Sequence, residues 1–228
     1  MTDDLRPDFD LIDAIDDLPF GYTWNGIAEF SPSLDRHAFV IGRPYTGKTH
    51  VASSIAVAAT AAGSTVINAT GRSLLVPEDR VAVSTRLKQT VQSIADGSRI
   101  DGDPSIIVIA DESILRGRNA AANLRRLTTI INDGPAVSVH LVLLARDVHL
   151  TAADDLDELD TFTMPAGILT VLLGRETATK RYDTFGQMVP TLDPGLPNSG
   201  LIASRGNEPQ QFRAWTMTRD DAARILDA

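Results

Sequence analysis

The sequence predicts an α/β fold built on a mostly parallel β-sheet with helices on its faces. Two observations support this class. Short, continuously apolar segments, of which residues 105–110 and 137–145 are the clearest, alternate with longer segments whose apolar side chains recur at helical spacing. A glycine-rich turn over residues 42–49 also connects one apolar segment directly to a helical one. Strands buried on both faces are continuously apolar, and their alternation with helices indicates βαβ units and a parallel sheet.

The individual elements follow from the same patterns. Aromatic residues around Asn25-Gly26 predict a hairpin near the N-terminus. The segment after the glycine-rich turn consists mainly of small apolar residues, as in a helix buried beside a sheet, and Gly63 ends it. Four apolar residues from Val83 to Ile94 give the next helix one apolar face. We expect a hairpin at 19–32, strands at 38–41, 64–68, 105–110, 137–145 and 168–173, and helices at 49–62, 81–96 and 120–132.

Composition narrows the class of protein. The chain has 228 residues, of which 43% are apolar, and this is enough for one α/β domain. We expect that domain at residues 19–228, after an acidic N-terminal arm at residues 1–18. The absence of cysteine excludes disulfides and thiolate metal sites. No apolar stretch reaches membrane-spanning length and the N-terminus is acidic, so we expect a cytoplasmic protein. A net charge of −9 argues against a wholly basic surface, but it allows a basic strip inside a ring.

The glycine-rich turn matches a Walker A motif. Residues 42–49 read Gly-Arg-Pro-Tyr-Thr-Gly-Lys-Thr. In such a loop the backbone N–H groups point at a triphosphate, Lys48 reaches the β- and γ-phosphates, and the Thr49 hydroxyl is a ligand for Mg²⁺. We therefore expect ATP and Mg²⁺ as cofactors. The residues expected to contact the nucleotide are Gly42, Arg43, Pro44, Tyr45, Thr46, Gly47, Lys48, Thr49 and His50.

Asp111 and Glu112 follow the apolar strand at 105–110 and match a Walker B pair. In P-loop enzymes the aspartate lies beside Mg²⁺, and the glutamate after it orients or deprotonates the attacking water. Asp111 is therefore a candidate magnesium residue together with Thr49. Glu112, Lys48 and Asp111 are the expected catalytic residues, and the pair predicts hydrolysis of ATP rather than binding alone.

Four stretches of the chain carry a family resemblance. They read Leu18-Pro-Phe-Gly-Tyr with a following glycine, His37-Ala-Phe-Val-Ile-Gly before the Walker A motif, Ile106-Ile-Val-Ile-Ala-Asp-Glu, and Val139-His-Leu-Val-Leu. In this order they resemble the FtsK/SpoIIIE motor ATPases of the FtsK/HerA superfamily, and a weaker similarity covers most of the remaining chain. The resemblance implies a RecA-like P-loop core that assembles into a homo-hexameric ring and pulls double-stranded DNA through its pore.

The chain departs from the family pattern at three places. Where the family has Thr-Gln-Arg after a core strand, this chain has Leu144-Ala145-Arg146, so the glutamine that senses the γ-phosphate is missing. Arg146 matches a basic family position and is the candidate DNA contact. The segment after it, residues 154–160, is acidic where the family has basic pore-lining residues.

The third departure concerns the arginine finger. At the position that supplies this trans-acting residue in the family, the chain offers Asn132, Gly134 or Pro135, depending on the alignment. An arginine finger is worth roughly 10³ to 10⁵ in rate, so either another arginine replaces it or hydrolysis is slow. The candidate replacements are Arg116, Arg118, Arg125, Arg126 and Arg181.

The remaining polar and aromatic landmarks have simpler interpretations. His37 and His140 lie in apolar strands, where a hydrogen-bonded core histidine is the expected role. His50 follows Thr49, so it either contacts phosphate or faces solvent. Trp24 and Trp215 are expected to pack at the edges of the core.

Three functions remain open on the sequence. The leading hypothesis is a stand-alone motor that translocates double-stranded DNA, as in viral genome packaging or the transfer of plasmid or mobile-element DNA. A viral origin would place it in the host cytoplasm or the virion, and a protein partner could recruit it. The second is a secretion-type motor acting on protein substrates, which the acidic segment suits better. The third is a nucleotide-binding assembly subunit with weak hydrolysis.

Overall fold

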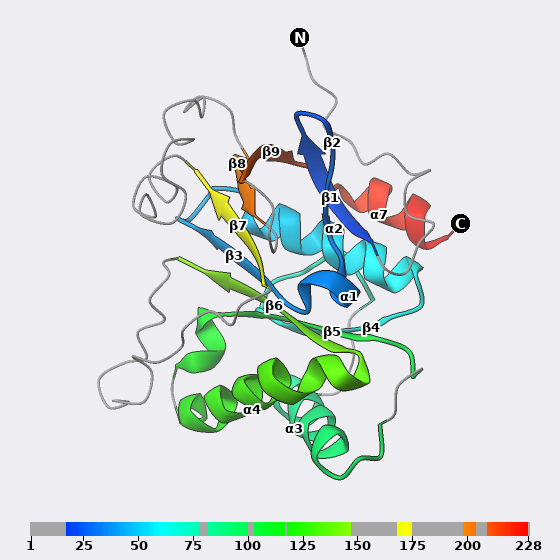
Figure 1. Ribbon diagram of the computed structural model, residues 1–228, viewed down its shortest axis with the longest axis vertical. Coiled ribbons are helices and arrows are strands. Elements are labelled where there is room, and N and C mark those ends of the chain that lie inside the picture. The colour runs from blue at the N-terminus through cyan, green and yellow to red at the C-terminus, as the bar shows by residue number, and fades with distance from the viewer. Residues whose placement is uncertain are drawn as a thin grey trace.

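One continuous sheet organises the protein. The computed structural model describes residues 17–77, 82–99, 103–116, 118–146, 168–174, 198–203 and 209–227. Within them the strand order is β2-β1-β9-β8-β7-β3-β6-β5-β4 (Figure 1). The strands are β1 (Leu18–Thr23), β2 (Gly26–Phe30), β3 (Ala38–Gly42), β4 (Thr65–Ala69), β5 (Ile106–Asp111), β6 (Val139–Ala145), β7 (Leu169–Leu173), β8 (Ser199–Ala203) and β9 (Gln210–Ala214). The helices are α1 (Pro32–Asp35), α2 (Lys48–Ala61), α3 (Val83–Ala95), η2 (Glu112–Leu115), α4 (Ala120–Asp133), η3 (Gly134–Val137) and α7 (Arg219–Leu226).

Strands β7, β3, β6, β5 and β4 form a parallel half-sheet. Val40 of β3 pairs with Leu144 of β6 on one side and with Val171 of β7 on the other. Strands β3, β6 and β7 are buried at every position, which explains why they read as continuous apolar runs. The predicted α/β class with a mostly parallel sheet is confirmed.

The other half of the sheet is antiparallel. The predicted hairpin is present as β1 and β2, and β1 pairs with β9, which pairs with β8. Phe20 and Phe212 meet edge to face across β1 and β9, with ring centroids 5.6 Å apart. Strands β8 and β9 and helix α7 were not among the expected elements. The two strands are short and partly exposed, so their apolar pattern is weak.

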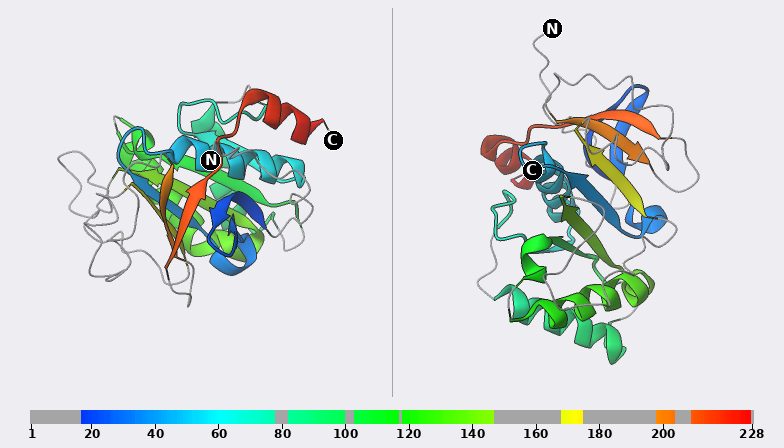
Figure 2. Two further views of the ribbon diagram at one scale, coloured as in Figure 1. Left: turned by 90° about the horizontal axis from the view of Figure 1, so that it is seen from above. Right: turned by 90° about the vertical axis from the view of Figure 1, so that its left-hand side faces the viewer.

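Helices cover both faces of the parallel half-sheet (Figures 1 and 2). Alternate side chains of β3 serve the two faces, because successive residues of a strand point in opposite directions. Phe39 and Ile41 join the core under α3 and α4, whereas Ala38 and Val40 join the core under α2. Helix α7 packs on α2, where Ala222 and Ile225 of α7 and Met217, which precedes the helix, form a buried cluster with Val57 of α2. None of the helices in the described ranges is both long and apolar enough to cross a membrane.

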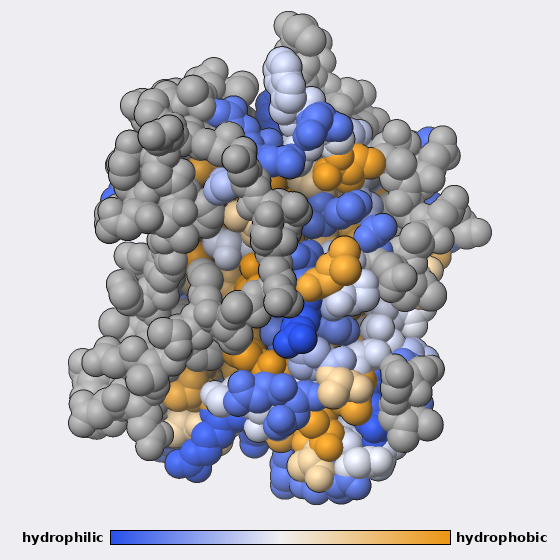
Figure 3. All heavy atoms as spheres, in the orientation of Figure 1, coloured by the Kyte–Doolittle hydropathy of each residue, from blue (hydrophilic) through white to orange (hydrophobic). Residues whose placement is uncertain are grey.

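Two predicted packing residues were assigned wrongly. Trp24 is 96% exposed, because it occupies the two-residue turn between β1 and β2, beyond the last strand pair. Val83 is 38% exposed, because it lies in the first turn of α3 while Leu87 carries the buried face. In the space-filling view, exposed apolar side chains of the described residues lie in separate groups between hydrophilic ones (Figure 3). Trp215, in contrast, is fully buried as expected.

Candidate active site

The predicted motifs converge at the carboxyl ends of the central parallel strands. Ile41, one residue before the end of β3, pairs with Ala145, the last residue of β6. Asp111, the last residue of β5, pairs with Leu144 of β6. The Walker A loop, the Walker B pair and Arg146 therefore emerge side by side at one edge of the sheet. In open α/β sheets, ligands bind at this edge.

The Walker A loop depends on its two glycines. Gly47 has φ of 103°, a left-handed conformation that favours glycine, and a Cβ there would lie 2.5 Å from Asn198 Oδ1. A Cβ on Gly42 would collide with the Thr46 hydroxyl. Between the two glycines, Tyr45 is also left-handed, with φ of 67°, and its side chain is fully exposed. The loop therefore has no room for a side chain at either glycine, and the Tyr45 side chain projects into solvent.

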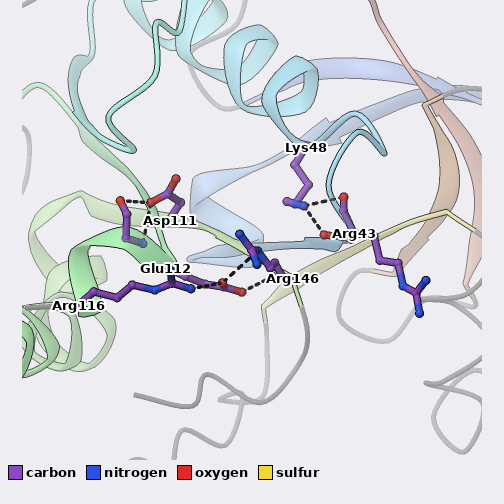
Figure 4. A network of polar contacts seen from close by, with 8 residues as sticks. Arg43, Lys48, Asp111, Glu112, Arg116 and Arg146 are labelled. Carbon is purple, nitrogen blue, oxygen red and sulfur yellow. Dashed lines mark hydrogen bonds and ion pairs between the residues drawn. The ribbon is translucent and has the colours of Figure 1, made fainter. Parts of the chain in front are cut away.

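Lys48 begins α2 and folds over the loop (Figure 4). Its Nζ donates to the carbonyl oxygens of Gly42 and Arg43, the latter at 2.9 Å. Thr46 Oγ1 donates to the same Arg43 carbonyl at 2.8 Å. Burial lowers the pKa of Lys48 to about 8, while the nearby carboxylate of Glu112 opposes the shift. The Lys48 ammonium group thus lies against the backbone of the loop that would surround the phosphates.

Thr49, the predicted magnesium ligand of the Walker A motif, has a neighbour that the sequence did not predict. Its hydroxyl accepts a hydrogen bond from Arg72 Nη1 at 3.3 Å. Arg72 lies in the turn after β4. One residue further along α2, His50 is half-buried, and burial lowers its pKa. Its backbone N–H is used within the structure, since it donates to the Gly47 carbonyl at 2.9 Å.

Asp111 and Glu112 have different partners. Asp111 Oδ1 accepts hydrogen bonds from the Ser113 N–H, at 2.9 Å, and from the Ser113 hydroxyl. The Asp111 side chain thereby caps η2. Glu112 Oε1 accepts the backbone N–H of Arg146, and Glu112 Oε2 lies 3.7 Å from Arg146 Nε and 3.8 Å from Arg116 Nη2 (Figure 4). The Glu112 carboxylate is therefore fixed between two arginines.

These groups line a single cavity of about 840 Å³, within the usual size range of sites for drug-sized ligands and cofactors. It brings together the Walker A loop, the Walker B pair, the end of β6 and two further segments. Its lining residues are Pro44, Tyr45, Gly47, Lys48, Thr49, His50, Thr70, Gly71, Arg72, Asp111, Glu112, Ser113, Arg116, Leu144, Ala145, Arg146 and Asn198.

Several solved structures have a fold similar to that of this chain. The conjugation coupling protein TcpA of pCW3, solved with ATPγS, matches with a TM-score of 0.69 at 15% identity, over 97% of this chain and 73% of that one. The cytoplasmic domain of the Thermomonospora curvata type VII secretion ATPase EccC matches with a TM-score of 0.63 at 14% identity, over 99% and 33%. EssC (ATPases 2 and 3) from Geobacillus thermodenitrificans gives 0.64 at 13% identity, over 97% and 50%.

The chain has the fold of these ATPases. The α/β ATPase fold that the sequence predicts is thereby confirmed. The chain spans half or less of the EccC and EssC structures. Neither a protein-family model nor a curated protein sequence matches it.

The candidate replacement arginines that the structure describes have different surroundings. Arg116 contacts Glu112, and Arg126 on α4 donates to Asn123 Oδ1 at 2.9 Å. Arg118 lines a smaller neighbouring cavity of about 340 Å³, and Arg125 is exposed on α4. Arg181, the acidic segment 154–160 and the arm 1–16 lie outside the described residues.

The two strand histidines lie at the opposite, amino-terminal ends of β3 and β6. His37 Nε2 contacts the Ile131 carbonyl at 3.0 Å, and its Nδ1 accepts the Leu141 N–H at 3.0 Å. His140 Nδ1 contacts the Arg36 carbonyl at 2.7 Å. Both are buried and have backbone partners, as expected for core histidines.

Sequence reasoning missed several lining residues, among them Thr70, Arg72 and Asn198. Thr70 and Arg72 follow β4, and Asn198 precedes β8 and touches the Walker A loop. The signal for the first two was the Thr70-Gly-Arg run directly after β4, which lies at the same sheet edge as the other motifs. Asn198 gave no such signal, because its position depends on the antiparallel strands.

Proposed function

We propose that the chain is an ATP-hydrolysing motor of the FtsK/HerA type that works on double-stranded DNA as a homo-oligomeric ring. The observation that carries the ATP-hydrolysing part of this proposal is the convergence of Lys48, Thr49, Asp111 and Glu112 on one cavity. The ATPase fold shared with TcpA, a structure that contains ATPγS, supports ATP as the nucleotide. Residues 19–228 would form the ATPase domain, and the expected location is the cytoplasm.

The residues present suit a bound Mg²⁺. The Thr49 hydroxyl and the Asp111 carboxylate line the same cavity and are hard oxygen donors, which Mg²⁺ prefers. No cluster of three or more metal-binding side chains occurs in the described ranges, which agrees with a site completed by substrate phosphates and water. A bound Mg²⁺ would neutralise charge on the β- and γ-phosphate oxygens.

The protein's own residues divide the work of hydrolysis. Lys48 holds the β- and γ-phosphates, and the Walker A backbone surrounds them. Glu112 orients a water and takes its proton as the water oxygen bonds to the γ-phosphorus. The bond from the γ-phosphorus to the bridging oxygen breaks, and ADP and phosphate leave. Arg146 and Arg116 fix the Glu112 carboxylate in one orientation for this step.

In a ring, the arginine finger that the family resemblance implies would have to come from a neighbouring subunit. Arg116 and Arg126 contact residues of their own subunit. Among the described candidates, Arg118 and Arg125 are therefore better placed to reach a neighbour, and both are exposed. Six subunits are the number that the family resemblance implies, and a head-to-tail interface that closes produces such a ring.

Duplex DNA is the proposed substrate because Arg146 matches a basic position in the family and also contacts Glu112, the proposed catalytic base. Its side chain is 63% exposed while its guanidinium lies beside Glu112. A phosphate contact at Arg146 would thus act directly on the carboxylate that handles water. A motor on protein substrates is the second candidate, favoured by the matching fold of EccC, which has also been solved with a signal sequence peptide. Weak hydrolysis by an assembly subunit is the third.

One experiment separates these possibilities. ATPase rate is measured with duplex DNA, with a translocated protein or signal peptide, and with neither, and particle mass is measured with a non-hydrolysable ATP analogue and Mg²⁺. Stimulation by DNA and a ring-sized mass support the proposal. Stimulation by polypeptide alone favours the second candidate, and a monomer that hydrolyses slowly under every condition favours the third.

A further inference from the structure

The turn after β4 places an arginine beside the Walker A helix. Arg72 Nη1 donates to Thr49 Oγ1 at 3.3 Å, and Arg72 lines the same cavity as the Walker residues. It also lies close enough to Lys48 to lower the pKa of that lysine through like charge. A second cation therefore lies beside the lysine that would bind the β- and γ-phosphates.

The backbone of this turn is held by its own polar side chains. Asn68 Nδ2 donates to the Arg72 carbonyl at 2.6 Å, and the Arg72 N–H donates to Thr70 Oγ1 at 3.2 Å. Thr70 is 3% exposed, and its N–H and hydroxyl both donate to Asn68 Oδ1. Gly71 has φ of 66°, which lets the chain turn toward the cavity. The main chain of Arg72 is thus fixed, while its side chain remains exposed at the cavity.

The charge balance around Arg72 is incomplete. In the described part of the chain, no carboxylate pairs with Arg72, since Asp111 bonds to Ser113 and Glu112 lies between Arg116 and Arg146. Its guanidinium instead donates to the neutral hydroxyl of Thr49. A guanidinium has five donors in a planar fork that suits phosphate oxygens, and a bond to an anion is stronger than one to a hydroxyl.

We propose that Arg72 binds the γ-phosphate of ATP from within the same subunit, in place of the trans arginine and the glutamine sensor expected at the family positions. The inference rests on the proposed ATPase function. The Thr49 hydroxyl does not serve Arg72 and a divalent cation together, because two cations at one oxygen repel each other. Arg72 then takes a terminal phosphate oxygen as its partner.

Arg72 acts in hydrolysis by charge alone. As the bond to the bridging oxygen breaks, negative charge is spread over the γ-phosphoryl oxygens and the leaving ADP, and the guanidinium neutralises part of it. Arg72 forms no covalent bond and accepts no proton, which goes from water to Glu112. ATP and ADP differ in the group that Arg72 binds, so this residue discriminates between them.

Binding of two nucleotides tests the inference without relying on turnover. The dissociation constants of Mg·ATPγS and Mg·ADP are measured for the wild type, Arg72→Ala and Arg72→Lys. Arg219→Ala on α7 is the control, since it removes the same charge from an exposed position on another element. In Arg72→Ala, ATPγS affinity should fall by about tenfold or more, while ADP affinity changes less than about threefold. Arg72→Lys should keep part of the difference, and Arg219→Ala all of it.

Turnover of the same variants completes the test. Arg72→Ala should lower kcat by about 100-fold or more, with a thermal unfolding midpoint close to that of the wild type. Equal losses of ATPγS and ADP affinity, or a kcat within twofold of the wild type, would overturn the inference while leaving the proposed function in place. If the wild type and Arg219→Ala bind neither nucleotide, the proposed function fails and the inference fails with it.

Discussion

The Glu112 carboxylate accepts the backbone N–H of Arg146 and lies 3.7 Å from the Arg146 guanidinium. This contact joins the ends of β5 and β6, which are neighbours in the parallel sheet. Glu112, the candidate base, is therefore held by Arg146, which the family resemblance predicts as a DNA contact. A change at either residue should affect the other.

Lys48 and Glu112 should separate binding from chemistry. Lys48→Ala should abolish nucleotide binding, because it removes the charge that holds the phosphates. Glu112→Gln should retain binding, because it keeps the shape of the side chain and removes only its capacity as a base. Thermal unfolding with and without Mg·ATPγS measures this, since a ligand at 100 times its Kd adds about 2.7 kcal/mol to stability. Nucleotide stabilisation of Lys48→Ala, or its loss in Glu112→Gln, would contradict the assignment.

Arg146→Ala should weaken duplex binding and DNA-stimulated turnover while nucleotide affinity is retained. Loss of one phosphate contact reduces the slope of log K against log salt by about 1. Titrations of labelled duplex at several salt concentrations measure the slope. Arg219→Ala, which removes one charge from an exposed position on α7, should leave the slope unchanged. Identical slopes for the wild type and Arg146→Ala would remove Arg146 from the DNA contact.

Nucleotide affinity should fall as pH rises above about 8. Burial holds the pKa of Lys48 at about 8, so the free protein loses this charge in mildly alkaline solution. Phosphate favours the charged lysine, which means that binding takes up a proton above this pKa. Calorimetric titration with Mg·ADP at pH 7 and pH 9.5, in buffers of different ionisation enthalpy, detects both effects. Equal affinity at the two pH values, without proton uptake, would contradict a phosphate-binding lysine.

Acid should destabilise the fold through His37. Burial lowers its pKa from 6.5 to about 4, so the unfolded chain binds a proton before the folded chain does. The stability contributed by neutral His37 is complete above pH 6.5 and is lost as the pH falls toward 4. From these two pKa values the loss is on the order of 3 kcal/mol. Burial shifts His140 in the same direction.

Urea unfolding at pH 7.5 and pH 5 should therefore show a smaller loss of stability for His37→Gln than for the wild type. His37→Gln removes the titrating group but keeps one donor and one acceptor near Ile131 and Leu141. An equal loss in both proteins would show that His37 does not control the acid sensitivity.

The sequence predicted the parallel half of the fold and most of the cavity, because both depend on local patterns. Strands such as β3 and β6 are apolar throughout, and the Walker residues occupy strand ends that parallel pairing must bring together. The packing role predicted for Trp24 was wrong, because composition alone does not distinguish an aromatic residue in a hairpin turn from one in a core. Strands β8 and β9, and with them Asn198, depend on long-range antiparallel pairing that leaves little local pattern. Arg72 was missed because its role depends on where the turn after β4 points.

The most direct test of ATP hydrolysis at this cavity is phosphate release from saturating Mg·ATP by the wild type and by Glu112→Gln at matched nucleotide occupancy. We expect turnover above background in the wild type and a loss of about 100-fold or more in Glu112→Gln, because proton transfer by a positioned base contributes roughly 10² to 10⁴ in rate. Equal turnover in the two proteins, or no turnover in a wild type that binds ATP, would contradict the claim that this cavity hydrolyses ATP.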